Sequence, residues 1–257
     1  MSDLIRTEPL ADGILLATIE RAAKGNALDT STVDALGGLL GRLADPRDEL
    51  GATRALILTG AGERAFSAGA DIATLRGLDA DAARDQMLHG QRVFGMLEDA
   101  PQVTIAAIRG VALGGGLELA MACDLRVAHP EARLGQPEIT LANIPGWGGT
   151  QRLPRLIGQG RALELILSGD PIGAPRALDI GLVNAVGDDP IAIAVALAER
   201  IVRHAPGAVA AGKQAVYAGE RDGIVSGLVR EAELVGERCV TPEQRAAVDA
   251  FLNRKKN

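Results

Sequence analysis

Aromatic residues are scarce in this sequence. Phenylalanine, tyrosine and tryptophan make up 2% of the 257 residues, and the formal net charge is −6. A chain with few rings to stack on bases, and with an acidic balance, is a poor partner for nucleic acid, so we predict none. The apolar fraction is still 47%, which predicts a globular protein with an aliphatic core.

Cysteine and histidine are also rare. Cys123 and Cys239 are isolated in the sequence, so neither a disulfide framework nor a metal cluster is predicted. Cys123 lies in an apolar run and is expected to be a buried thiol. The three histidines, His89, His129 and His204, share no ligand spacing, which argues against a metal site and against a Ser/His/Asp triad.

Long apolar runs are missing as well. No run is long enough to span a bilayer, and the first residues lack the apolar core of a signal peptide. We therefore predict no membrane association and a cytoplasmic location.

Apolar strands alternate with helical patterns up to about residue 150, which predicts α/β layers. The expected strands are 14–19, 54–60, 104–108, 110–113 and 125–128, with a hairpin turn before the first and a weaker strand at 182–186. Helices are expected over 30–44, up to about 99, over 116–122 and, toward the end, over 154–159, 161–168, 175–180, 190–203, 206–220, 221–238 and 242–253.

One stretch combines three glycines with a carboxylate. Residues 111–120 have the sequence VALGGGLELA, in which an apolar strand precedes the glycines and Glu118 opens a helix. Glycine allows a ligand close to the backbone, and the free N–H groups of a helix start attract negative charge. The stretch is compatible with an oxyanion site and equally with a tight turn capped by a glutamate.

A second loop, Ser67 to Asp71, also follows an apolar strand and is made of small residues. If neighbouring strands of one sheet carry both loops, one N–H from each forms a two-donor oxyanion hole. Two ordinary turns are the alternative.

A second glutamate follows Glu118 by twenty positions. Glu138 comes directly after Gln136 and Pro137 and before the glycine-rich loop 144–149. Paired carboxylates in an apolar pocket can hold one water, with one acting as acid and one as base. Either glutamate alone is more often a surface or capping residue, but together they favour an acid–base site.

These segments together resemble the crotonase superfamily, also called the enoyl-CoA hydratase/isomerase family. The matching segments are 66–72, 112–124, 134–138 and 144–153, and the resemblance extends from about residue 14 to 255. It implies an α/β fold in which repeated ββα units form a spiral over residues 1–195. It also implies a C-terminal helical region, residues 196–257, that assembles homotrimers or homohexamers made of two trimers.

The resemblance also implies a reaction. The substrate is an acyl-CoA thioester, and no further cofactor is needed because coenzyme A belongs to the substrate. The amides of Ala70 and Gly115 form the oxyanion hole. Glu118 helps to activate a water that adds to the β-carbon, and Glu138 supplies the proton to the α-carbon. Two glutamates in these places imply an enoyl-CoA hydratase.

The coenzyme A moiety is implied to lie along Ala23 and Lys24 and along the segment that includes Ala68, Asp71 and Ile72. Most of this contact is to backbone. Lys24 and the C-terminal residues 254–256 are expected either to reach coenzyme A phosphates or to be ordinary solvated charges.

The loop around Gly146 completes the implied site. Gly146 is expected at a helix start, where it polarises the thioester oxygen or steadies the loop. Asn143, Trp147 and Leu134 differ from the residues common in the family, which leaves the acyl-chain length open. Trp147 is expected on the loop surface, with a place in the pocket wall as the alternative.

Two other functions remain open at this point. Enoyl-CoA isomerases of the family typically keep one carboxylate, near the second position. A member without turnover, which binds CoA esters or RNA or acts as a scaffold, usually lacks a catalytic carboxylate.

Overall fold

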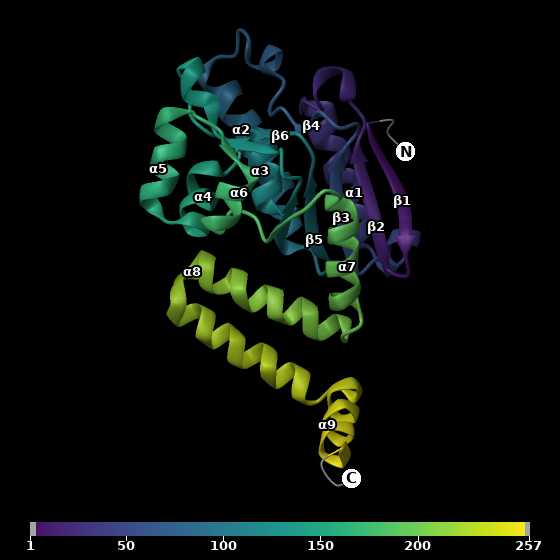
Figure 1. Cartoon of the computed structure of the whole chain (residues 1–257). Helices are drawn as coiled ribbons and strands as arrows, with labels where there is room; N and C mark the ends of the chain where they lie inside the picture. Colours follow the sequence, from purple (N-terminus) through teal and green to yellow (C-terminus); the bar gives the residue numbers. More distant parts are fainter. Residues whose placement is uncertain (1–3, 255–257) are drawn as a thin grey trace.

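Two sheets form the body of the molecule in the computed structural model, which describes residues 4–254 (Figure 1). The larger has the order β1-β2-β3-β5-β7-β10, and its strands are Ile5–Ala11, Ile14–Ile19, Ala55–Gly60, Val103–Ile108, Leu125–Ala128 and Ala185–Val186. The smaller has the order β4-β6-β8-β9, and its strands are Ala65–Ser67, Val111–Leu113, Arg133–Gly135 and Ile172–Gly173. From β2 to β10 the larger sheet is parallel, while β1 and β2 form the predicted antiparallel hairpin.

Strands of the two sheets alternate along the chain. β3 in the larger sheet is followed by β4 in the smaller one, β5 by β6, and β7 by β8. The helices α2 (Ala80–Asp99) and α3 (Gly115–Ala122) follow the first two pairs. The third pair leads into the 3-10 helix η4 (Pro137–Leu141) and then into α4 (Gly149–Ile157). This arrangement confirms the predicted spiral of ββα units.

The central strands of the larger sheet are buried on both faces, which is why their sequences are continuous apolar runs. Alternate residues point to opposite sides. Leu56 and Leu58 join the core cluster beneath α1 (Thr30–Ala44), α2 and α3, whereas Ala55 and Ile57 pack with α7 (Pro190–Val202) on the other face.

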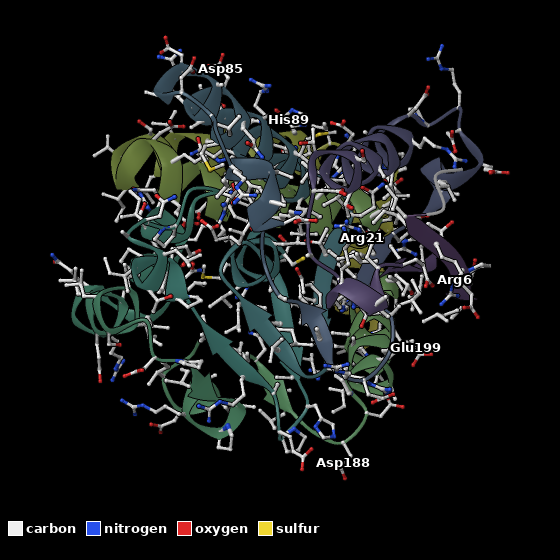
Figure 2. The ribbon with its side chains drawn as sticks, turned by 90° about the horizontal axis from the view of Figure 1, so that it is seen from above. Arg6, Arg21, Asp85, His89, Asp188 and Glu199 are labelled. Carbon is white, nitrogen blue, oxygen red and sulfur yellow. The ribbon has the colours of Figure 1, made fainter. Side chains whose placement is uncertain are left out.

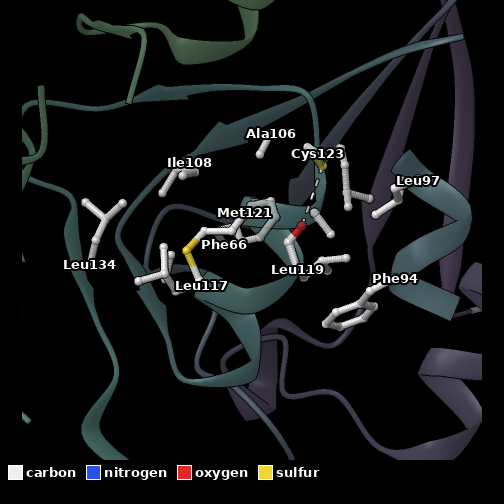
Figure 3. Packing of buried hydrophobic residues seen from close by; sticks show 14 of the residues in the cluster. Phe66, Phe94, Leu97, Ala106, Ile108, Leu117, Leu119, Met121, Cys123 and Leu134 are labelled. Atoms are coloured by element: carbon white, nitrogen blue, oxygen red, sulfur yellow. Dashed lines mark hydrogen bonds between the residues drawn. The ribbon is translucent and has the colours of Figure 1, made fainter. Parts of the chain in front are cut away.

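Helix α3 is buried over its whole length. Figure 3 shows Phe66 of β4 and Ile108 of β5 on the side of Leu117, and Phe94 of α2 on the side of Leu119 of this helix. The thiol of Cys123 is buried and donates to the Leu119 carbonyl oxygen at 3.6 Å, which confirms the predicted buried cysteine. Burial raises the pKa of this thiol to about 12. The helix that carries Glu118 is therefore fixed inside the core.

Several predicted helix limits are confirmed, and the predicted start of α4 is wrong. Helix α1 begins after Asp29, whose side chain accepts from the Thr32 amide at 2.9 Å, as an N-cap should. Helix α2 begins at residue 80, since the short 3-10 helix η3 (Ile72–Leu75) follows β4. Helix α4 begins at Gly149 rather than near 154, because its first turn is held by a distant side chain described below. The other helices are α5 (Gln159–Ser168), α6 (Ala174–Asp179), α8 (Pro206–Cys239) and α9 (Pro242–Arg254).

The C-terminal helices extend away from the sheets (Figure 1). Helix α8 bends at Gly223, which has φ 83°, and so consists of the two predicted segments. The predicted division at residue 195 falls inside α7, which packs against the larger sheet. Lys255 and Lys256 of the expected basic cluster lie outside the described residues. Across residues 4–254, no helix has both the length and the apolar character needed to cross a membrane.

A buried polar cluster attaches α8 to the body. Lys213 Nζ lies 2.9 Å from Asp124 Oδ2 and donates to the carbonyl oxygens of Leu97 and Gln102. Tyr217, one helical turn later, donates from its hydroxyl to Asp124 Oδ1 at 2.9 Å. Both charged side chains of the pair are largely removed from solvent, at 9% and 13% exposure. Asp124 is therefore the centre of this attachment.

The substitution Asp124→Ala is expected to lower the free energy of unfolding by roughly 3–5 kcal/mol, because it leaves the Lys213 charge buried without its partner. Urea denaturation measures this loss. The matched control is Asp99→Ala, which breaks the exposed pair with Arg221 and should cost no more than about 1 kcal/mol. Equal losses in the two variants would contradict the importance of the buried attachment.

Candidate active site

The two glycine-containing loops leave the smaller sheet side by side. β4 pairs in parallel with β6, in a register that places Ser67 opposite Ala112. The loops then pack so closely that no side chain fits between them: a Cβ on Gly69 would lie 2.7 Å from the Leu113 carbonyl oxygen, and one on Gly116 would lie 2.3 Å from that of Ser67. Glycine is required here because backbone meets backbone.

Each loop presents one unused backbone amide. The Leu28 amide donates to the Gly69 carbonyl oxygen at 2.8 Å and the Asp71 amide donates to that of Leu28 at 2.9 Å, which leaves the Ala70 N–H between them. Within the described chain, neither the Ala70 N–H nor the Gly115 N–H donates to a protein acceptor. The two are close together, since a Cβ on Gly115 would lie 3.2 Å from the Ala70 nitrogen. Two such amides can hold one oxyanion.

Glu118 is buried beside these amides, with 2% of its surface exposed. Its Oε1 accepts from the Trp147 amide at 2.8 Å and from the Gly149 amide at 2.7 Å, at the start of α4. Burial and, to a smaller extent, the charge of the nearby Glu138 raise the pKa of Glu118 to about 7, against the two amide hydrogen bonds, which lower it. The second oxygen, Oε2, is left for a water or a substrate.

Glu138 lies over the triple glycine from the first turn of η4. A Cβ on Gly114 would lie 2.9 Å from Glu138 Oε1, so the carboxylate rests directly on this glycine. Burial raises the pKa of Glu138 as well. The buried Gln136, with its amide nitrogen turned to Glu138, donates to both carboxylate oxygens at 2.9 and 3.1 Å. The sequence showed Gln136 next to Glu138, but nothing in the pattern assigned it a role.

These groups face a cavity of about 710 Å³. Of the residues predicted for the site, seven contribute to its wall: Ala68, Ala70, Ile72, Gly115, Glu118, Glu138 and Gly146. Aliphatic side chains supply much of the rest, including Leu75, Met87 and Leu141. The cavity therefore combines an apolar lining with two carboxyl groups and two free amides, which suits a ligand with an apolar chain and a carbonyl oxygen.

Ala23, Lys24 and Asp71 lie beside this cavity, outside the wall residues just described. Their loop is attached to the site, because the Ala68 amide donates to the Gly25 carbonyl oxygen at 2.8 Å. The Asp71 carboxylate contacts Lys24 Nζ at 3.6 Å and Arg21 Nη2 at 3.3 Å. Burial acts to raise the pKa of Asp71, but the hydrogen bond from Arg21 and the neighbouring charges hold this pKa below its usual value.

Two expectations for the loop before α4 are wrong. Trp147 is not on the surface: it is 4% exposed and lines the cavity. Gly146 is not at a helix start, since α4 begins at Gly149 with Gly148 as its N-cap. The Gly146 carbonyl oxygen accepts from Gln91 at 2.8 Å, and the helix start binds Glu118 instead. These contacts join residues far apart in the sequence, so local patterns could not indicate them.

The histidines lie away from the cavity wall. His89 is on the outer side of α2, and its Nε2 lies 2.7 Å from Asp34 Oδ1 (Figure 2). In the part of the chain that the structure describes, no group of three or more His, Cys, Asp or Glu side chains could hold a metal ion.

Comparisons with known proteins agree with this geometry. The sequence model of the family described as "Enoyl-CoA hydratase/isomerase" matches residues 10–257. The chain is 41% identical over 245 residues to a short-chain-enoyl-CoA hydratase of Clostridium acetobutylicum, an alignment that covers 95% of this chain and 92% of that one. It is 35% identical over 257 residues to the 2,3-dehydroadipyl-CoA hydratase of Escherichia coli, covering 99% and 97%.

A solved structure shows the same fold. The crystal structure of an enoyl-CoA hydratase from Bacillus anthracis superposes with a TM-score of 0.90 at 38% identity, covering 98% of this chain and 96% of that one. The matches run through the sheets, both glycine loops and the C-terminal helices alike. From its sequence and its fold, the chain belongs to the enoyl-CoA hydratase/isomerase family.

Proposed function

We propose that this protein is an enoyl-CoA hydratase, which adds water reversibly and on one face across the double bond of a trans-2-enoyl-CoA thioester. The observation that carries the proposal is the pair Glu118 and Glu138, two carboxyl groups of raised pKa in one apolar cavity beside two free amides. The coenzyme A is part of the substrate, and the reaction as proposed needs no other cofactor.

The oxyanion hole polarises the substrate. The Ala70 and Gly115 amides donate to the thioester oxygen, and they stabilise the negative charge that this oxygen gains when the β-carbon is attacked. Because the amides belong to two packed loops that glycines bring into contact, they need little rearrangement when the charge develops.

The two glutamates divide the proton transfer. The Trp147 and Gly149 amides stabilise Glu118 as an anion, so Glu118 is the base that takes a proton from water as its oxygen bonds to the β-carbon. Glu138 holds the second proton and passes it to the α-carbon. Each hydration leaves Glu118 with one more proton and Glu138 with one fewer, so both groups exchange protons with solvent water before the next turnover, and dehydration runs the same steps in reverse.

Coenzyme A binding, assembly and location complete the proposal. The coenzyme A moiety follows a path bordered by Ala23, Lys24, Ala68, Asp71 and Ile72.

The exposed apolar residues of α8, such as the 75%-exposed Ile224, support assembly into a trimer or a pair of trimers. The unpaired thiols of Cys123 and Cys239 are in keeping with a cytoplasmic enzyme.

Incubation of the protein with crotonyl-CoA is expected to give 3-hydroxybutyryl-CoA, which mass spectrometry detects by the added water. A 3-enoyl-CoA supplied alone tests isomerisation, whose product keeps the mass of the substrate and gains the absorbance of the conjugated thioester. Formation of the 2-enoyl product from the 3-enoyl substrate, without hydration of crotonyl-CoA, would identify an isomerase. Binding of both thioesters without any product would identify a non-catalytic member.

A further inference from the structure

The single tryptophan of the chain is held between glycines on two helices. A Cβ on Gly90 of α2 would lie 2.4 Å from Nε1 of Trp147, and a Cβ on Gly115 of α3 would lie 2.5 Å from its ring atom Cζ3. Phe94 meets the indole edge to face, with the ring centres 5.4 Å apart. The indole therefore occupies space that is open only because Gly90 and Gly115 carry no side chain.

The position of the Trp147 ring does not depend on a hydrogen bond. The indole Nε1 is buried and has no partner among the residues that the structure describes. A buried N–H without an acceptor is unfavourable, so the ring is kept here by its shape. The substitution Trp147→Phe removes an unpartnered donor rather than a hydrogen bond, and the fold is expected to tolerate it.

Trp147 lies next to the groups that bind the two ends of the enoyl thioester, the β-carbon end and the thioester oxygen. Its amide binds Glu118, which delivers water to the β-carbon, and its ring contacts Gly115, whose amide binds the thioester oxygen. An enoyl group spans these two points, so the carbons beyond the β-carbon leave the site beside the indole. Together with Met87 of α2, the Trp147 ring forms the cavity wall on that side.

We propose that the Trp147 indole ends the acyl channel and thereby selects short acyl chains. This inference rests on the proposed hydration of enoyl-CoA thioesters. A smaller side chain at position 147 opens the channel toward Gly90 and Phe94, and a longer acyl chain then fills the volume that the ring occupied. Each methylene buried there should raise kcat/KM roughly fourfold.

The test compares kcat/KM for trans-2-enoyl-CoA thioesters of four, six, eight and ten carbons. In Trp147→Ala, the ratio of the eight-carbon to the four-carbon value is expected to rise at least ~10-fold over wild type, with a smaller rise in Trp147→Phe. A displaced Glu118 would lower both values together and cancel in the ratio. Leu167→Ala, an apolar truncation on the exposed side of α5, should leave the ratio unchanged.

The possible results distinguish a failure of this proposal from a failure of the proposed hydratase function. If Trp147→Ala does not fold, the phenylalanine variant carries the test alone. An unchanged ratio in the folded Trp147 variants, or a wild-type protein that prefers the ten-carbon substrate, overturns the proposal. A wild-type protein that hydrates none of the four thioesters contradicts the proposed function itself, and this is a different observation from a change in the ratio.

Discussion

The substitution Glu118→Gln is expected to lower kcat/KM for crotonyl-CoA hydration at least ~100-fold, because the glutamine cannot take a proton from water. Its amide oxygen can still accept from Trp147 and Gly149, so the loop before α4 should stay in place. Glu138→Gln should cause a loss of similar size by removing the proton donor to the α-carbon. A steady-state hydration assay measures both.

The same Glu118→Gln variant is expected to be more stable than wild type at alkaline pH. Folding raises the pKa of Glu118 from an ordinary 4.5 to about 7, so between these values the folded state binds more protons than the unfolded state. The wild-type protein therefore loses stability as pH rises from 4.5 through 7, whereas the glutamine variant does not lose this contribution. The advantage of the variant should be about 2 kcal/mol larger at pH 8 than at pH 5.

Urea denaturation of both proteins at the two pH values checks this difference. Substitution of an exposed carboxylate, Glu237→Gln on α8, serves as the control and should give the same difference from wild type at either pH. Hydration within tenfold of wild type in Glu118→Gln would contradict the two-glutamate mechanism. A stability advantage that does not change with pH would contradict the raised pKa.

The substitution Gly115→Ala is expected to lower kcat by about 10²–10³-fold, the usual effect of losing one oxyanion-hole donor. The new Cβ would lie 2.5 Å from the Trp147 ring and 3.2 Å from the Ala70 nitrogen, so the loop must move and both amides lose their alignment. The binding of coenzyme A should change much less, since the proposed contacts with Ala23, Lys24 and Asp71 lie outside the cavity wall that the new Cβ disturbs. Measuring kcat for crotonyl-CoA and the affinity for coenzyme A separates the two effects.

A glycine of α2 provides the control for this substitution. A Cβ on Gly95 has no neighbouring heavy atom within 4 Å, so Gly95→Ala should keep wild-type activity and the helix should be slightly more stable. A kcat for Gly115→Ala within threefold of wild type would show that this amide does not hold the thioester oxygen.

The sequence predicts the two loops and the buried helix of this site well, because the residue patterns that indicate them are local. Glycines after apolar strands mark the two loops. From the sequence, a shared oxyanion hole is conditional on neighbouring strands, and the pairing of β6 with β4, a strand that the sequence does not predict, meets this condition. The helix over residues 30–44 and the apolar run that buries Cys123 are equally local signals, and both predictions are confirmed.

What the sequence could not show depends on contacts between distant residues. Trp147 is buried because Gly90, 57 positions earlier, leaves room for it, and a loop residue among glycines gives no sign of such a partner. The early start of α4 depends on Glu118, whose carboxylate binds the amide of Gly149.

The contacts of Glu118 have a consequence for folding during synthesis, because the ribosome makes the chain from the N-terminus onward. The carboxylate is synthesised before the Trp147 and Gly149 amides that bind it, and its burial is unfavourable until they arrive. In a nascent chain that ends before α4, we therefore expect α3 to be loosely packed and exposed to water. The third turn of the spiral supplies both of these amides together, and it also brings Glu138 to the cavity that Glu118 lines.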